Sequence, residues 1–275
     1  MSWIRAVWIV VSVLFITIAL LPAHAAAMVA RSPFQKRTAL IWHRCVARIF
    51  GLRIHVEGEQ HRSTKTGTLY VANHVSWLDI VVLGAVLQTS FIAKSEVRSW
   101  PLFGWLARLQ STTFVDRNRR TKVHDQSNAI RQRLLNGDNL VLFPEGTTTD
   151  GNYVYPFNSS LFAAIATGVE GDHIAVQPLS IAYNGQGGLP MGRQWRPLAA
   201  WGGTVTLGEH LPGVLRDGLF DVQIRFGPVI KDAQMQTRKQ ICAQLEQHIR
   251  QMTAKGLRGE PVSSKPAEKA LEGAA

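Results

Sequence analysis

The N-terminal end of the chain constrains its fold most, because it contains an apolar stretch that is unusual for a surface in water. Residues 6–30 carry no charged side chain, and the core of this stretch, at 6–23, is 18 residues long. As a helix, the core would span about 27 Å, which matches the hydrocarbon layer of a membrane. The stretch therefore predicts a helical membrane anchor. The alternative is a cleaved signal peptide, with Arg5 before the apolar run and small residues at 23–25.

The residues that follow this stretch are basic. The first 56 residues hold seven Lys and Arg side chains and no Asp or Glu, and the whole chain has a net charge of +11. Positive flanks mark the cytoplasmic side of a membrane helix, so we expect an inner-membrane protein whose main domain faces the cytoplasm. A basic surface beside an apolar end favours an anionic membrane as a partner over nucleic acid.

Residues 33–50 predict a second helix with both apolar and basic positions. Ile41, Cys45 and Ile49 recur at helical spacing, and cations such as Arg44 lie between them. A helix of this kind can lie against lipid headgroups. The alternative is an ordinary surface helix of the domain.

Strands and helices alternate along the rest of the chain. Short apolar runs, such as 67–73 and 139–143, are separated by amphipathic stretches such as 119–137. This order predicts an α/β fold in which helices flank a mixed sheet. Pro178, in the middle of the strand expected at 174–184, indicates an edge strand or a bulge. We divide the chain into an N-terminal anchor with its basic helix, a globular domain, and a disordered tail, at 1–50, 51–255 and 256–275.

His74 and Asp79 lie where an apolar strand ends and a helix begins. Active sites of α/β folds gather at such strand ends. A histidine beside a carboxylate can act as a general base, because the carboxylate fixes its tautomer and stabilises the imidazolium. The alternative is structural, because Ser76 and Asp79 also have the spacing of a helix capping box.

Two more polar segments follow apolar strands. One strand leads into a run of cations that begins at Arg117, which suits an anion such as phosphate, although a solvated basic loop has the same composition. The other leads into FPEGTTT at 143–149. There Gly146 permits close backbone approach, and Glu145 and the hydroxyls can orient a polyol. The alternative for this segment is a plain turn.

Cysteine and metal chemistry are not expected to organise this chain. Cys45 and Cys242 form no CxxC pair, which excludes a disulfide framework or a structural zinc site and is compatible with a reducing cytoplasm. The His, Asp and Glu residues show no metal-ligand spacing, so we expect neither a metal nor another cofactor.

Four segments in this order, NHVSWLD, FVDR, FPEGT and QPLS, resemble the lysophospholipid acyltransferase family. The resemblance covers residues 68–183, and the combination of His-x4-Asp with FPEGT is specific. The family includes 1-acyl-sn-glycerol-3-phosphate and glycerol-3-phosphate acyltransferases. The resemblance implies an O-acyltransferase that moves a fatty acyl group from a thioester, acyl-CoA or acyl carrier protein, to the free hydroxyl of a lysolipid.

The resemblance also implies roles for single residues. It makes His74 the general base and Asp79 its orienting partner. Arg117 matches the arginine that the family uses to hold the phosphate of the acceptor, and Lys94 matches another basic position. The FPEG segment matches the positions that bind the acceptor and shape its site, namely Glu145, Gly146 and Thr147.

One position departs from the family pattern. Many phosphatidate-forming members carry an arginine after FPEGT, whereas this chain has Thr148. A cation such as Lys94, Arg119 or Arg120 would have to replace it. The string FPEGTTTDG, followed by YPF, resembles members that acylate lyso-ornithine lipid, a phosphorus-free amino-acid lipid.

We therefore expect a membrane-bound enzyme of phospholipid biosynthesis that converts 1-acyl-sn-glycerol-3-phosphate into phosphatidic acid. The first alternative is acylation of lyso-ornithine lipid. An inactive lipid-binding relative is another, but the intact His74 and Asp79 argue against it. A secreted hydrolase would require cleavage at Ala25. The chain contains no Gly-x-Ser-x-Gly elbow, which fits the direct transfer, without an acyl-enzyme, that the family uses.

Overall fold

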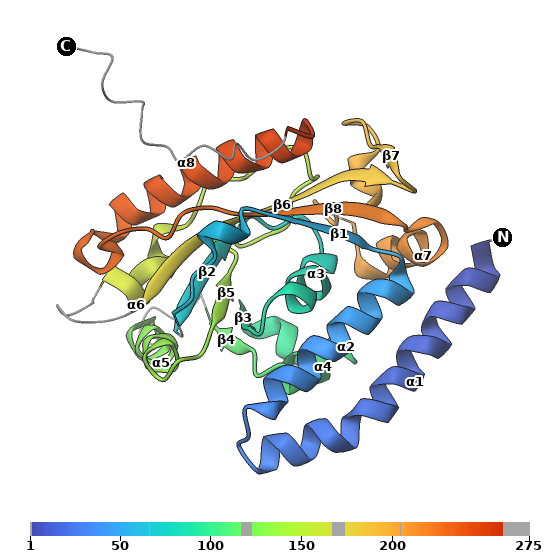
Figure 1. Ribbon diagram of the computed structural model, residues 1–275, viewed down its shortest axis with the longest axis horizontal. Coiled ribbons are helices and arrows are strands. Elements are labelled where there is room, and N and C mark those ends of the chain that lie inside the picture. Colours follow the sequence, from blue (N-terminus) through green and yellow to red (C-terminus); the bar gives the residue numbers. More distant parts are fainter. Residues whose placement is uncertain (1, 66, 117–122, 167–173, 204, 261–275) are drawn as a thin grey trace.

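In the described part of the chain, helices cover both faces of one eight-stranded sheet (Figure 1). The computed structural model describes residues 2–65, 67–116, 123–166, 174–203 and 205–260. The α-helices are α1 Ser2–Val29, α2 Phe34–Phe50, α3 Leu78–Val86, α4 Phe103–Leu109, α5 Val123–Leu135, α6 Ala163–Ala166, α7 Leu207–Asp217 and α8 Arg238–Leu257. The strands are β1 Arg53–Glu57, β2 Thr68–Ala72, β3 Ser90–Lys94, β4 Thr113–Val115, β5 Leu140–Leu142, β6 Ala175–Gln186, β7 Leu189–Pro190 and β8 Phe220–Phe226.

The sheet is mixed, which confirms the predicted fold class. Its strands lie in the order β1-β8-β6-β2-β5-β3-β4, and β7 pairs with β6. Strands β2, β3, β4, β5 and β6 run parallel, whereas β8 is antiparallel to β6 and parallel to β1. Because the carboxyl ends of the parallel strands meet at one edge of the sheet, the polar segments that follow them come together there.

Strand β2 lies between two hydrophobic cores. Leu69 and Val71 belong to the core shared with α5, α6 and α8, while Tyr70 and Ala72 belong to the core shared with α2 and α3. This division follows from the alternation of side chains along a strand. All five residues of β2 are buried, as expected for a strand in the interior of a parallel sheet that is covered on both faces.

Helix α8 begins with the predicted capping box. The Thr237 hydroxyl accepts from the N–H of Gln240, and the Gln240 side chain accepts from the N–H of Thr237. The helix continues to Leu257, so the start of the predicted tail is helical. The tail residues 261–275 lie outside the described residues.

The prediction that Pro178 marks an edge strand or a bulge is wrong. Strand β6 lies between β2 and β8, and Pro178 lies just beyond the end of the pairing with β8. The carbonyl of Pro178 accepts from the N–H of Gly227 (2.9 Å), but proline has no N–H to donate in return. The side-chain amide of Gln177 donates to the Gly227 carbonyl instead (2.9 Å). A neighbouring side chain thus replaces the missing backbone donor, which allows proline in an interior strand.

Helices α1 and α2 form a hairpin that packs against α3 (Figure 1). Helix α2 buries Thr38, His43, Val46, Ala47 and Phe50, whereas its basic face is exposed. Its packing is that of a helix of the domain, as the alternative for 33–50 proposed. Contact with lipid headgroups stays a prediction.

Hydrogen bonds hold the N-terminal end of α1 against the domain. The Arg5 guanidinium donates to the carbonyls of Phe50 (2.9 Å) and Val214 (3.2 Å), and also to that of Leu215. These carbonyls lie in the last turns of α2 and α7, where the helix dipole favours cations. Arg5 therefore ties α1 to two other helices.

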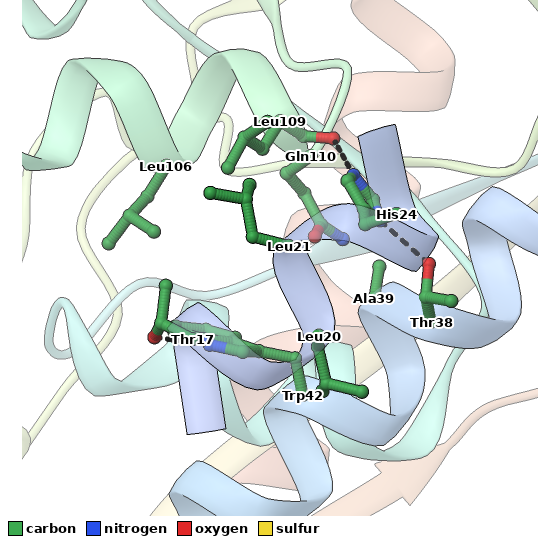
Figure 2. Close-up of a pocket in the computed structure, with 10 residues that line it drawn as sticks. All are labelled: Thr17, Leu20, Leu21, His24, Thr38, Ala39, Trp42, Leu106, Leu109 and Gln110. Atoms are coloured by element: carbon green, nitrogen blue, oxygen red, sulfur yellow. Dashed lines mark hydrogen bonds between the residues drawn. The ribbon is translucent and has the colours of Figure 1, made fainter. Parts of the chain in front are cut away.

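The other end of α1 is held by His24, beside a small apolar cavity between α1, α2 and α4 (Figure 2). Nδ1 of the buried His24 is bonded to the hydroxyl of Thr38 (2.7 Å), and Nε2 to the carbonyl of Leu109 (3.0 Å). The apolar lining of the cavity includes Leu20, Leu21, Trp42 and Leu106. Both ends of α1 thus contact the same domain, so the helix lies along it.

Between these two ends α1 exposes an apolar face. By length and composition, the helix is apolar enough to cross a membrane. The large exposed side chains are Trp3, Ile4, Val7, Trp8, Val10, Val11, Leu14, Phe15 and Ile18. An exposed apolar surface that is built from so many large side chains is typical of an interaction with lipid or with another apolar surface.

Candidate functional site

His74 follows β2, Asp79 lies in the first turn of α3, and their side chains are hydrogen-bonded. His74 Nδ1 lies 2.8 Å from Asp79 Oδ2. Asp79 is fully buried, whereas the His74 side chain is 19% exposed. The His74 ring also stacks on Phe143, with 4.1 Å between the ring centroids. The bond to Nδ1 leaves Nε2 as the ring nitrogen that can accept a proton from a substrate.

Four donors surround the Asp79 carboxylate. Oδ2 accepts from His74 Nδ1 and from the backbone N–H groups of Val75 (2.7 Å) and Ser76 (3.0 Å). Oδ1 accepts from the hydroxyl of Tyr183 (2.9 Å). A buried carboxylate is costly unless donors of this kind compensate its charge. Asp79 is therefore held in one position, with one oxygen aimed at the imidazole.

The capping-box alternative is half correct. Asp79 accepts from the N–H of Ser76, as the acidic residue of a capping box does. However, the Ser76 hydroxyl makes no hydrogen bond among the described residues, and α3 has no side-chain cap. A single oxygen of Asp79 both holds the start of α3 and orients His74, so the two explanations do not exclude one another.

Glu145 connects the His74 segment to the FPEG turn. Oε1 accepts from the backbone N–H of His74 (2.6 Å), and Oε2 accepts from that of Tyr155 (2.6 Å). Burial raises the pKa of Glu145 to about 8, even though these two N–H groups favour the charged form. The resemblance implied that Glu145 binds the acceptor. Both oxygens bond to backbone N–H groups, so these contacts position the His74 segment, and binding of the acceptor by Glu145 stays a prediction.

The rest of the FPEGTTT turn also contacts the His74 segment. Gly146 has a positive φ of 73°, which favours glycine. The N–H of Thr149 donates to the carbonyl of His74 (3.0 Å), and the hydroxyl of Thr148 donates to the carbonyl of Trp201. The side chain of Thr147 is exposed. Thr148 therefore uses its hydroxyl to hold the backbone, at the position where the family resemblance led us to expect an arginine.

The structure adds two residues that the sequence analysis missed. The side chain of Asn73 pairs with the backbone of Ile181 through two hydrogen bonds of 2.9 and 2.8 Å, which fixes the strand end before His74 to β6. Tyr183, on β6, donates to Asp79. Asn73 could have been suspected as a polar residue at a strand end. No sequence pattern indicates the contact made by Tyr183.

The remaining predicted site residues are cationic. Lys94 ends β3, which is separated from β2 by β5, so Lys94 lies at the same edge of the sheet as His74, and its side chain is exposed. Arg117, with Arg119 and Arg120, lies outside the described residues. The structure thus brings His74 together with Asp79 and the FPEG turn, and it leaves the anion-binding role of Arg117 as a prediction.

We expect Glu145→Gln to lower turnover about tenfold or more. Glutamine keeps one acceptor oxygen but points an NH₂ group at a backbone N–H of His74 or Tyr155. A buried donor without a partner costs about 1–3 kcal/mol, and the segment can relieve this cost by moving His74 away from its position. A loss of about 1.4 kcal/mol of transition-state stabilisation corresponds to a factor of ten in rate. Steady-state kinetics of the variant is the measurement, with the exposed Glu96→Gln as the control. Unchanged turnover of Glu145→Gln would contradict the positioning role.

The same variant tests the pH dependence of stability. Because the pKa of Glu145 is raised to about 8, the folded protein keeps a proton that the unfolded chain releases at lower pH. The contribution of Glu145 to the free energy of unfolding should therefore fall as the pH rises from about 4.5 to about 8. Denaturant unfolding across this range should show that Glu145→Gln lacks this decline. Equal pH dependence in both proteins would show that Glu145 titrates normally.

Comparison with known proteins places this site in a family. A family model described as Acyltransferase matches residues 53–182. The lyso-ornithine lipid O-acyltransferase of Brucella abortus (strain 2308) is 43% identical over 263 residues, which cover 94% of this chain and 97% of that protein. The lyso-ornithine lipid O-acyltransferase of Rhizobium meliloti (strain 1021) is 45% identical, with 83% of this chain and 79% of that protein covered.

Two further similarities concern proteins named for a phosphate acceptor. The 1-acyl-sn-glycerol-3-phosphate acyltransferase of Neisseria gonorrhoeae is 39% identical over 121 residues, which cover 44% of this chain and 46% of that protein. The crystal structure of the 1-acyl-sn-glycerophosphate acyltransferase PlsC from Thermotoga maritima aligns with a TM-score of 0.61 at 20% identity. That alignment covers 94% of this chain and 99% of that structure, and at this identity it shows that the fold is shared.

Proposed function

Because this chain belongs to the acyltransferase family and acts as an O-acyltransferase, we propose that its acceptor is lyso-ornithine lipid. The observation that carries the proposal is the extent of the similarity. The Brucella lyso-ornithine lipid enzyme matches 94% of this chain, whereas the Neisseria 1-acyl-sn-glycerol-3-phosphate enzyme matches 44%. The proposal reverses the order of the two acceptors expected from the sequence, where the phosphate acceptor came first.

The turn after FPEG supports an acceptor without phosphate. The hydroxyl of Thr148 holds the carbonyl of Trp201, and the next charged residue is the carboxylate of Asp150. A phosphate group gains most from charge-assisted bonds to cations. Ornithine with one amine acylated keeps one ammonium and one carboxylate, so a carboxylate beside the site is compatible with its headgroup.

The geometry supports direct transfer of the acyl group. His74 Nε2 takes the proton from the acceptor hydroxyl while that oxygen attacks the carbonyl carbon of the thioester. The buried Asp79 stabilises the imidazolium that forms. The C–S bond then breaks, and the imidazolium returns the proton to the leaving thiolate. The thioester, acyl-CoA or acyl carrier protein, is a co-substrate, and the reaction needs neither a metal nor a further cofactor.

The cationic residues complete the proposed acceptor site. Lys94 is the last residue of β3, which ends at the same edge of the sheet as β2, and Arg117 comes two residues after β4 in the sequence. In a lyso-ornithine lipid they would bind the carboxylate, the one anionic group of the headgroup. Gly146 and Thr147 would shape the site beside it.

We also propose that the enzyme works at the cytoplasmic face of the inner membrane. The exposed apolar face of α1 supports contact with lipid. A helix that crossed the bilayer would carry Arg5 to the far side, but Arg5 is bonded to the ends of α2 and α7. The proposed attachment is therefore a helix that lies in one leaflet, with the cations of α2 near anionic headgroups.

Expression in two bacterial strains tests the acceptor. One strain makes lyso-ornithine lipid but cannot acylate it, and in the other the 1-acyl-sn-glycerol-3-phosphate acyltransferase can be switched off. We expect ornithine lipid in the first strain and no rescue of growth in the second. Rescue of the second strain without ornithine lipid in the first would assign the phosphate acceptor. Membrane-bound protein that does neither would support the inactive lipid-binding relative.

A further inference from the structure

Tyr183 contacts the catalytic carboxylate from the interior of the sheet. It lies on β6 opposite Val222 of β8, and it is 1% exposed. Its ring packs edge-on against Phe220, with 6.2 Å between the ring centroids. Its hydroxyl donates to Asp79 Oδ1 at 2.9 Å. The hydroxyl is therefore held in place by the strand and the core around it.

We propose that Tyr183 is a positioning residue that tunes the basicity of His74 through Asp79. The inference rests on the acyltransferase activity and on His74 as the base, not on the identity of the acceptor. The Tyr183 hydroxyl donates to Asp79, and Asp79 is bonded to His74, so the three side chains form one chain of hydrogen bonds.

The physical reason lies in how the charge of Asp79 is shared. Oδ2 already accepts three hydrogen bonds, from His74 and from two backbone N–H groups. Among the residues that the structure describes, Tyr183 is the one donor to Oδ1. Its O–H dipole points its positive end at the carboxylate and weakens the negative potential at the imidazole. The hydroxyl thus favours the neutral form of His74, which is the form that can accept a proton.

Tyr183 remains a donor throughout the working pH range. Burial raises the pKa of Tyr183 well above its usual value, and the negative charge of Asp79 acts in the same direction. The other titratable group that contacts His74 is Glu145, which accepts from its backbone N–H. The positive charge of Arg250 on α8 acts to lower the pKa of Glu145. Neither Glu145 nor Arg250 contacts the Tyr183 hydroxyl. Their influence on the titration of His74 is therefore the same in the wild-type protein and in variants at position 183.

The test is the pH profile of kcat/KM for Tyr183→Phe, measured with the lysolipid that the wild-type protein turns over. We expect the acidic limb to move up by at most about one pH unit, because only the part of the hydrogen-bond strength that differs between neutral and charged His74 acts on the imidazole. Activity should fall by up to about tenfold on the acidic side, recover to within about twofold at alkaline pH, and show an unchanged KM for the lysolipid. NMR titration of His74 in the same variant should show the same upward shift, and it needs no acceptor.

Tyr70→Phe is the matched control. Tyr70 is also a buried tyrosine of the sheet, at 2% exposed, and its ring packs against Phe226 rather than the catalytic pair. This variant should leave the acidic limb in place. A loss of activity for Tyr183→Phe that is equal at every pH, or a His74 titration that does not move, would show that Tyr183 only packs the core and would overturn the proposal.

A second substitution tests the proposal in the opposite direction and keeps the ring and the hydroxyl. 3-Fluorotyrosine at position 183 is a more acidic and therefore stronger donor. We expect it to move the acidic limb and the His74 titration down. An upward shift, or none, would overturn the proposal even if Tyr183→Phe did not fold. Turnover of lyso-ornithine lipid by the wild-type protein stands as a separate result, so the failure of one proposal does not affect the other.

Discussion

His74→Ala should lower acyl transfer by about 10²–10⁴-fold, which is the usual loss when a general base is removed. His74 Nδ1 is occupied by the buried Asp79, so in the proposed reaction Nε2 is the nitrogen that takes the proton of the acceptor hydroxyl. Alanine offers no group in its place, and no water is expected to take the proton with similar efficiency. Transfer of a labelled acyl group by equal amounts of membrane-bound wild-type and variant protein is the measurement.

His55→Ala is the matched control for this substitution. His55 lies on β1 with a side chain that is 62% exposed, and it pairs with Asp221 at 3.9 Å rather than with the site. Its replacement should leave turnover unchanged. If His74→Ala kept near-normal turnover while remaining folded and membrane-bound, His74 would not be the base.

Asp79→Asn should lower turnover on the order of 10³-fold. An asparagine oxygen can still accept from Val75 and Ser76, and its NH₂ group can donate to the oxygen of Tyr183. The amide carries no charge, however, so it does not stabilise the imidazolium, and in the opposite orientation its NH₂ group would face Nδ1 and hold the ring in the wrong tautomer. The loss should therefore appear in kcat, with little change in the KM for the donor.

The thermal stability of the same variant separates catalysis from helix capping. If the asparagine turns its NH₂ group toward Ser76 and the imidazole, the bond from the N–H of Ser76 is lost, which would weaken the start of α3 at a cost of about 1 kcal/mol. A variant with lower thermal stability but normal activity per folded molecule would mean that Asp79 only holds the helix. We expect the activity to fall far more than the stability.

Much of the fold could be predicted from local patterns in the sequence. The alternation of strands and helices gave the correct class, and the capping box at Thr237 is visible because it needs only neighbouring residues. That an interior strand accepts Pro178 could not be predicted. The side chain of Gln177 supplies the missing donor to Gly227, which lies about 50 residues away in the chain. Sequence spacing contains no information about a contact of that range.

The same distinction applies to the site and to the membrane segment. The pair His74 and Asp79 could be predicted, since the two residues lie on one short segment. The contacts of Glu145 could not, because they involve backbone N–H groups of two separate segments. The apolar face of α1 predicted contact with a membrane. That α1 lies along the domain depends on the bonds from Arg5 to the distant α7, which no local pattern reveals.

The central claim is that the protein acylates lyso-ornithine lipid with His74 as the general base. A competition assay with purified protein tests this claim most directly. One acyl thioester is mixed with equal amounts of lyso-ornithine lipid and 1-acyl-sn-glycerol-3-phosphate, and the two products are measured by mass. The product ratio equals the ratio of kcat/KM for the two acceptors. We predict predominantly ornithine lipid with the wild-type protein and neither product above background with His74→Ala. Predominantly phosphatidic acid from the wild-type protein would contradict the claim. So would a yield from His74→Ala that equals the wild-type yield.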